Sequence, residues 1–212
     1  MINPELEINC NVYKRLGEKY SYLWQATVLL VFCMCVPLFP VQAQQGEPKE
    51  GAFSVRIAQT RLVDTIYYLD ATFDYELSTE AELALDSSVP LTIVIEIELF
   101  REQNYWWDDK LKTIEQRYEI KFQSFGRQYV LKSLHEDNKR RFFSRLDEVF
   151  RALGRISIPL VPAEQLDNAS SYVARVTTYL DVDALPSSLQ TMSLFSEQWD
   201  IRSQPLQCSV SP

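Results

Sequence analysis

The sequence predicts a mainly β protein, an antiparallel β-sandwich of about six or seven strands that carries two short helices. Runs of alternating apolar and polar residues recur along the chain, most clearly between Val89 and Leu134. Such alternation buries one face of a strand and leaves the other in solvent, as in antiparallel sheets. A stretch around residue 150 has helical spacing instead. Strand order and the choice between a sandwich, a barrel and an α+β arrangement stay open.

The length and composition indicate one folded domain with a substantial core. The chain has 212 residues, and 46% of them are hydrophobic. This composition is typical of a globular protein. The net charge of −8 argues against nucleic acid or an anionic lipid surface as the main partner, because either needs a basic footprint.

Residues 1–43 have the pattern of a signal peptide. Three basic residues precede an apolar run from Leu23 to Phe39, and Val41-Gln42-Ala43 has small residues at the positions that a signal peptidase reads. An uncleaved membrane anchor is the alternative, because the apolar run approaches the length of a membrane span. Both interpretations place the following residues outside the cytoplasm. We therefore expect a periplasmic protein, anchored in the inner membrane only if this segment is retained.

The rest of the chain is expected to contain a polar linker (44–51), a single β-rich domain (52–203) and a frayed tail (204–212). The first strand places Phe53, Val55 and Ile57 on one face. A turn at residues 61–64 leads to a long strand over 65–77 with one buried face. A short helix follows, in which Thr79 and Glu82 form a capping box and which ends before Pro90.

The stretch from Val89 to Leu134 predicts three strands of a meander, at 93–99, 114–122 and 129–131. Glu96 and Glu98 lie on the polar face of the first of these strands. We expect them to pair with charges on the neighbouring strand, namely with Arg117, Glu119 or Lys121.

Beyond a charged loop at 135–141, a helix is expected to start at the N-cap Ser144, to have Asp147 in its first turn and to end at Gly154. Its apolar positions follow the spacing of an amphipathic helix, and they are Leu146, Val149, Phe150 and Leu153. A proline-containing connection over 156–168 then leads to the last clear strand, 171–183.

Few residues offer catalytic chemistry. His135 is the only histidine, and its place in a charged loop favours a solvated turn. Three of the four cysteines precede residue 40, so Cys208 has no disulfide partner in the exported part, and we expect neither a metal nor a cofactor. The carboxylates that could serve acid–base or cation chemistry lie mostly on polar strand faces, and they are Asp70, Asp74, Glu96, Glu98, Asp108 and Asp109.

The candidate partner-binding residues are Tyr105, Trp106 and Trp107. Alternation places Tyr105 and Trp107 on one face and Trp106 on the other. At least one ring is then left outside the core, where Trp and Tyr are favoured in protein interfaces. Packing of these rings over the end of the core is the alternative.

Several separated motifs resemble the DUF4390 family of uncharacterised bacterial exported proteins. They are Arg61-Leu62-Val63-Asp64, Tyr68-Leu69-Asp70-Ala71, Pro90-Leu91-Thr92, Glu96-Ile97-Glu98, Trp106-Trp107-Asp108, Gln116-Arg117-Tyr118, Arg127-Gln128-Tyr129 and Arg151-Ala152-Leu153-Gly154. The resemblance covers about residues 53–202. It implies no catalytic residues, and it suggests by analogy an accessory role beside a membrane sensor kinase.

The sequence thus predicts a non-enzymatic periplasmic interaction or accessory module with a protein partner, such as a membrane sensor kinase. Contact with a membrane is expected only through the N-terminal segment. A carboxylate-based envelope hydrolase and a small-ligand or lipid carrier remain as alternatives, and they require a pocket with converging carboxylates or an apolar cavity of about 300 Å³ or more.

Overall fold

A computed structural model describes residues 49–102, 109–136, 139–167, 169–193 and 195–210. By its contacts the chain divides into two units, Met1–Gly46 and Glu47–Pro212, and the fold below is that of the second unit. The expected signal peptide lies outside the described residues. Within the described residues, no helix combines the length and the apolar character that a membrane span needs.

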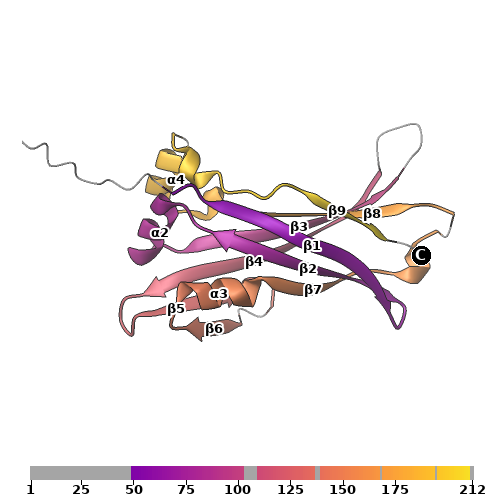
Figure 1. Cartoon of the computed structure of the whole chain (residues 1–212), viewed down its shortest axis with the longest axis horizontal. Helices are drawn as coiled ribbons and strands as arrows, with labels where there is room; N and C mark the ends of the chain where they lie inside the picture. The colour runs from indigo at the N-terminus through magenta and orange to yellow at the C-terminus, as the bar shows by residue number, and fades with distance from the viewer. Residues whose placement is uncertain (1–48, 103–108, 137–138, 168, 194, 211–212) are drawn as a thin grey trace, which may run out of the picture. The chain divides into compact units, whose positions relative to one another are not determined.

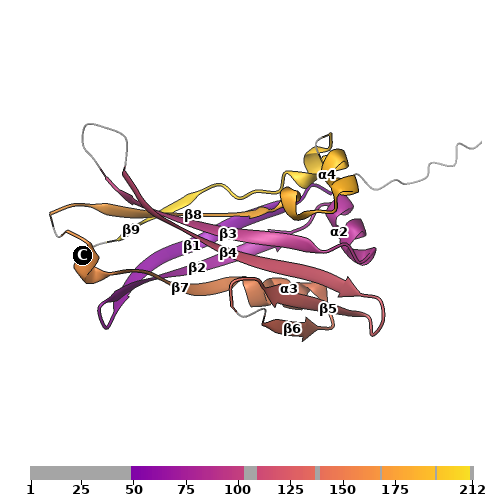
Figure 2. The same cartoon turned by 180° about the vertical axis from the view of Figure 1, so that it is seen from behind.

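Two antiparallel sheets pack face to face, which confirms the predicted mainly β class (Figures 1 and 2). One sheet has three strands in the order β1-β2-β7, and the other has six in the order β6-β5-β4-β3-β8-β9. The strands are β1 (Ala52–Val63), β2 (Ile66–Glu76), β3 (Leu91–Arg101), β4 (Asp109–Gln123), β5 (Gln128–Ser133), β6 (Arg140–Phe143), β7 (Arg155–Pro162), β8 (Tyr172–Leu180) and β9 (Leu206–Val210).

The described strands exceed the predicted number because β6, β7 and β9 lie where the sequence indicated a loop, a connection and a frayed tail. All three are edge strands. Edge strands are often short or contain proline, which blocks pairing on the free side, and β7 contains Pro159 and Pro162. The expected frayed tail over 204–212 is wrong for β9, which pairs antiparallel with β8 and buries Val210.

The strands β2 and β3 form the centre of the core, as their alternation predicted. Leu69 of β2 and Ile93 and Ile95 of β3 are fully buried between the sheets. β3 pairs with β4 on one side and with β8 on the other, so both of its edges are hydrogen-bonded.

A bulge in β1 changes the face on which Ile57 lies. Val55 pairs with Phe73 and Ile57 pairs with Thr72, which leaves Arg56 without a partner in the ladder. An extra residue in one strand reverses the alternation beyond it. Ile57 is therefore 53% exposed on the outer face, whereas the alternation predicted that it shares a face with Phe53. The strand also continues to Val63, so that the turn follows at Asp64 and Thr65.

Both predicted helices are present, each shifted by one residue at its start. α2 (Thr79–Asp86) has Ser78 as its N-cap, with Ser78 Oγ accepting from Ala81 N. The predicted cap Thr79 instead accepts from the backbone N–H of Lys49. That contact ties the last residues of the expected linker to the domain.

α3 (Leu146–Leu153) begins after Arg145 without a side-chain cap, and Gly154 follows its end as predicted. A further helix, α4 (Ser187–Ser193), was not expected. Three short 3₁₀ turns, Ala163–Gln165, Val182–Ala184 and Glu197–Trp199, complete the described helical elements.

The two sides of the sandwich differ. On one side β1 lies against β9, where Thr60 Oγ1 donates to the carbonyl oxygen of Ser209 at 2.8 Å. On the other side α3 contacts β2 and β7 of one sheet and β5 and β6 of the other. Lys112 of β4 also reaches across this side, because its Nζ donates to the carbonyl oxygen of Leu160 in β7 at 2.8 Å.

Candidate functional site

The predicted partner-binding residues Tyr105, Trp106 and Trp107 lie outside the described residues, between the end of β3 and the start of β4. Arg101, the last residue of β3, donates from its Nη2 to Oδ2 of Asp109, the first residue of β4, at 2.6 Å. Asp109 is therefore already paired with a cation of the protein.

The neighbouring candidate Asp108 also lies outside the described residues. Among the residues that are described, no three His, Cys, Asp or Glu side chains cluster as a metal site requires. The structure thus adds no support for the cation site considered at Asp108 and Asp109.

Ion pairs across the strands account for three further candidate carboxylates. Asp70 pairs with Arg61 and Asp74 with Arg56 on the outer face of the three-stranded sheet. Glu98 pairs with Lys110 at 2.9 Å and with Arg175 at 3.6 Å. The sequence predicted pairing of this kind, but the register brings other partners to Glu98 than Arg117, Glu119 or Lys121, because Glu98 lies opposite Thr113.

Glu96 differs from these carboxylates. It lies opposite Glu115 in the β3–β4 ladder. Its pKa is raised by burial, and further by the charges of Glu98 and Glu115. A raised pKa can mark a catalytic acid when the group lies in a cleft. Glu96 lines none of four concave surfaces formed by the described residues. Glu96 therefore gives the carboxylate-hydrolase alternative no support.

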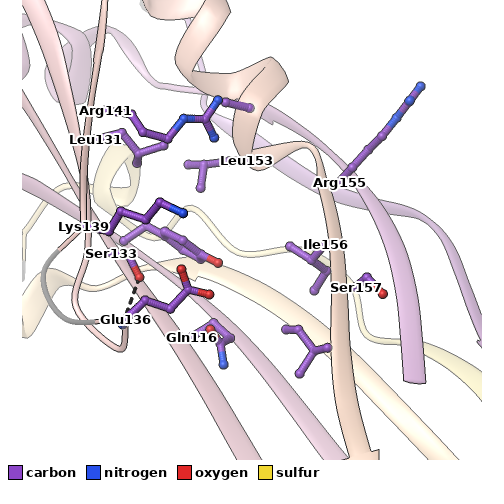
Figure 3. A pocket seen from close by; sticks show the side chains of 13 residues that line it. Gln116, Leu131, Ser133, Glu136, Lys139, Arg141, Leu153, Arg155, Ile156 and Ser157 are labelled. Carbon is purple, nitrogen blue, oxygen red and sulfur yellow. Dashed lines mark hydrogen bonds between the residues drawn. The ribbon is translucent and has the colours of Figure 1, made fainter. Parts of the chain in front are cut away.

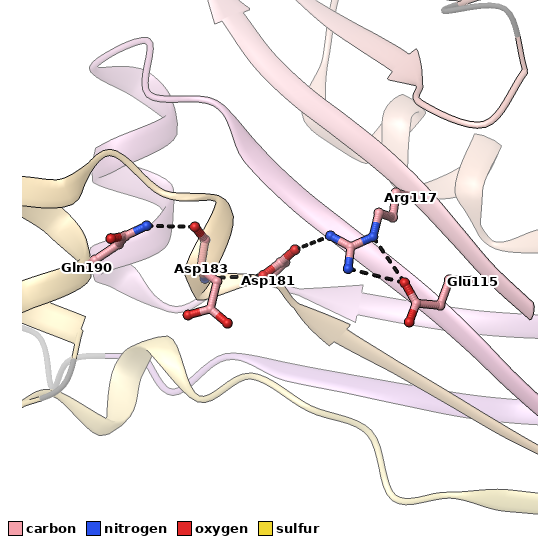
Figure 4. A network of polar contacts seen from close by, with 5 residues as sticks. All are labelled: Glu115, Arg117, Asp181, Asp183 and Gln190. Carbon is pink, nitrogen blue, oxygen red and sulfur yellow. Dashed lines mark hydrogen bonds and ion pairs between the residues drawn. The ribbon is translucent and has the colours of Figure 1, made fainter. Parts of the chain in front are cut away.

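A polar network on the outer face of the six-stranded sheet has a structural role (Figure 4). Arg117 of β4 donates to Glu115 and, at 2.5 Å, to Asp181 Oδ2. Asp181 in turn accepts from the backbone N–H of Asp183, whose carbonyl oxygen accepts from Gln190 of α4. These contacts fix the connection between β8 and α4 against β4.

His135 does not form a nucleophile–base pair with its neighbour Ser133. Ser133 Oγ lies 3.2 Å from Nδ1 and 3.3 Å from Nε2 of His135, so neither nitrogen points at it in preference to the other. A general base needs a directed hydrogen bond and an orienting group. Ser133 Oγ instead accepts from the backbone N–H of Glu136, and the His135 ring lies edge-on to Tyr118. These contacts describe a structured turn.

A notch of about 250 Å³ opens beside α3, between the two sheets (Figure 3). The strand register places its polar groups: Tyr118 pairs with Ser133, and Leu131 pairs with Arg141, so these side chains share the inner face of the sheet. Lys139 and Glu136 come from the connection between β5 and β6.

The walls of the notch differ in character. Its polar residues Lys139, Glu136 and Tyr118 come from β4 and the β5–β6 connection, whereas its apolar residues Leu153, Ile156 and Ile158 come from α3 and β7. The pKa of Tyr118 is raised by burial and by the charge of Glu136. Its hydroxyl therefore keeps its proton at neutral pH and remains a donor.

The lining cations are not equally available. In Figure 3 the side chain of Arg155 points away from the other residues of the notch. Arg141 lies over the ring of Phe143, with 5.1 Å between its guanidinium carbon and the ring centroid. Neither Lys139 nor Arg141 forms an ion pair with any described carboxylate. Lys139 is thus the freest positive group at this site.

The opposite face of the same strands is also basic. Lys132 pairs with Arg140 in the β5–β6 ladder, and both point outward because Leu131 faces the core. We call the following outer-face and hairpin-tip residues the basic edge: Lys121, Phe125, Arg127, Lys132, Arg140 and Phe142. Its cations form no ion pair with a described carboxylate, and Phe125 and Phe142 are 97% and 57% exposed.

The charge of the chain is strongly segregated around this edge. Residues 121–155 contain 9 Lys and Arg but 4 Asp and Glu, whereas the remaining chain contains 12 and 25. The net charge of the whole chain hides this basic region, so the net charge did not predict it. A sliding sum of charge along the chain would have found it.

The family model of a domain of unknown function, DUF4390, matches residues 50–208. The chain belongs to the DUF4390 family. No curated protein and no solved structure matches the chain significantly. The DUF4390 match includes both the notch and the basic edge, so these features lie within the family domain.

The lining of the notch could not be found from sequence spacing. Tyr118 lies in β4, Lys139 in the β5–β6 connection and Ile156 in β7. Only the pairing of β4 with β5 and the packing of α3 against both sheets bring them together. No local period marks such a site. The basic edge is different, because all of its residues fall within one continuous segment.

Proposed function

We propose that this DUF4390 protein is an exported, non-enzymatic interaction module that docks an acidic segment of a partner protein on its basic edge. The observation that carries the proposal is the group of cations without a described carboxylate partner, set beside the exposed Phe125 and Phe142. Unpaired charge of one sign with exposed aromatic rings is typical of a docking surface.

The position of the basic edge favours a protein over other anionic partners. β6 is the outer strand of the six-stranded sheet and pairs only with β5 among the described strands, so its other edge offers backbone groups to an added strand. A partner strand with acidic side chains would meet Lys132 and Arg140 on the outer face. A periplasmic partner such as a membrane sensor kinase remains the assignment that the family resemblance suggests.

In-cell crosslinking with a photo-reactive residue at Phe142 tests this proposal. We expect a specific protein adduct that the triple variant Lys121→Gln, Lys132→Gln, Arg140→Gln abolishes, because it removes the attraction for acidic groups. The control Gln165→Glu, Gln204→Glu, Gln207→Glu changes the net charge equally at exposed positions elsewhere and should retain the adduct.

Other outcomes would contradict the docking proposal. Equal loss in both triple variants would show that only the overall charge matters. Loss in Trp106→Ala or Trp107→Ala with retention in the basic-edge variant would assign docking to the Tyr105–Trp107 segment instead. Binding of the wild type to anionic vesicles, with no protein adduct, would assign the edge to a membrane surface.

A further inference from the structure

The notch has its own chemistry, separate from docking at the basic edge. Side chains of β6 alternate between the two faces, so Arg141 lines the notch, together with Lys139 just before the strand, while Arg140 and its ladder partner Lys132 face outward. A ligand of the notch would not need the partner of the edge. The two sites can therefore be tested independently.

We propose that the notch binds a small monocarboxylate with a short, branched or aromatic apolar body. Lys139 faces the carboxylate, with Arg141 adding positive charge and the hydroxyl groups of Tyr118 and Ser133 offering hydrogen bonds. Charge-assisted hydrogen bonds of this kind are stronger than neutral ones. The apolar body packs on Leu153, Ile156 and Ile158 across the notch.

The size and charge of the notch limit the ligand. Its volume of about 250 Å³ lies below the range of about 300–1,000 Å³ that drug-sized ligands occupy. Glu136 stands on the same wall as Lys139 and repels a second negative charge. A dicarboxylate or a phosphate is therefore disfavoured relative to a single carboxylate.

Titration of the purified protein with 4-methylpentanoate, followed by NMR or calorimetry, tests this assignment. We expect saturable binding at millimolar ligand, and weaker binding of both 4-methylpentanamide, which lacks the charge, and acetate, which lacks the apolar body. Lys139→Gln should weaken 4-methylpentanoate binding by about tenfold or more, as loss of one charge-assisted hydrogen bond implies. Lys132→Gln, with the same change in charge on the opposite face, should leave the affinity unchanged.

A second variant addresses the apolar wall. Ile156→Thr keeps a β-branched side chain but replaces its ethyl group by a hydroxyl, which removes apolar surface from this wall. It should weaken binding while the melting temperature shows that the protein stays folded. The proposal is overturned if the amide binds as tightly as the acid, if Lys139→Gln and Lys132→Gln have equal effects, or if the wild type shows no saturable binding. None of these results would alter the crosslinking outcome at the basic edge, so the two proposals fail separately.

Discussion

Glu96 carries its charge on the outer face of the six-stranded sheet, opposite Glu115 and near Glu98. Glu98 is paired with Lys110 and Arg175, whereas Glu96 forms no ion pair with any described residue. Burial and two like charges therefore oppose its ionisation in the folded protein. The unfolded chain relieves all three effects, which links Glu96 to the pH dependence of stability.

We expect Glu96→Gln to stabilise the protein at pH 7 by a few tenths to about 1 kcal/mol, the usual range for cross-strand charge pairs. The folded pKa of Glu96 is raised, so ionisation destabilises the native state. That penalty is present above the raised pKa, and it is absent below the ordinary value of 4.5. The gain from Glu96→Gln should therefore disappear as the pH falls below that value.

Thermal unfolding of the wild type and of Glu96→Gln, between pH 7 and a pH below 4.5, measures this difference in stability. The control is Glu164→Gln, which removes an exposed charge outside the cluster and should change the stability little at any pH. A destabilised Glu96→Gln protein at pH 7 would show that the carboxylate forms a favourable interaction that these contacts do not include.

At the scale of elements, the edge strands complete the core in spite of their weak sequence patterns. Val210 of β9 is 1% exposed and pairs with Tyr172 of β8, which is 3% exposed. The apolar inner face of the six-stranded sheet is thus extended beyond β8 by residues that the sequence assigned to a frayed tail. Pairing with β8 and packing against β1 supply the order that local propensity does not.

Val210→Ala should lower the free energy of unfolding by about 2 kcal/mol, because it removes two buried methyl groups and leaves a small cavity. Gln207→Ala, at an exposed position of the same strand, should change it by less than about 0.5 kcal/mol. Chemical denaturation of both variants gives the comparison. Equal, small effects would mean that β9 contributes little to the folded state.

The contrast between predicted and unpredicted elements has a physical cause. β2 and β3 are long strands in the interior of their sheets, and each packs one face against the core. That face is apolar along most of its length, so the alternation in the sequence predicted both strands. α3 has the helical spacing of Val149 and Leu153, both buried. β7 was interrupted by prolines, and the bulge at Arg56 reversed the face of Ile57. The spacing of residues in the sequence predicts neither the bulge nor the packing of α3 against both sheets, beside which the notch lies.

At the scale of the whole domain, the pairing order predicts how stability is distributed. β3 lies in the interior of the six-stranded sheet, and its residues Ile93, Ile95 and Ile97 are almost completely buried. β6 lies at the edge, has four residues, and three of them are exposed. Strands with few buried contacts open locally, whereas the central strand opens only when the whole domain unfolds.

Native-state hydrogen exchange should therefore show two classes of amide. Those of β3 are expected to exchange with the full free energy of unfolding and a steep dependence on denaturant, because their exposure requires the core to open. Those of β6 that pair with β5 are expected to exchange with a much smaller free energy and little denaturant dependence. Equal values for the two strands would show that the basic edge is as rigid as the core. A β6 strand that opens readily would let its outer edge accept a partner strand without disturbing the sandwich behind it.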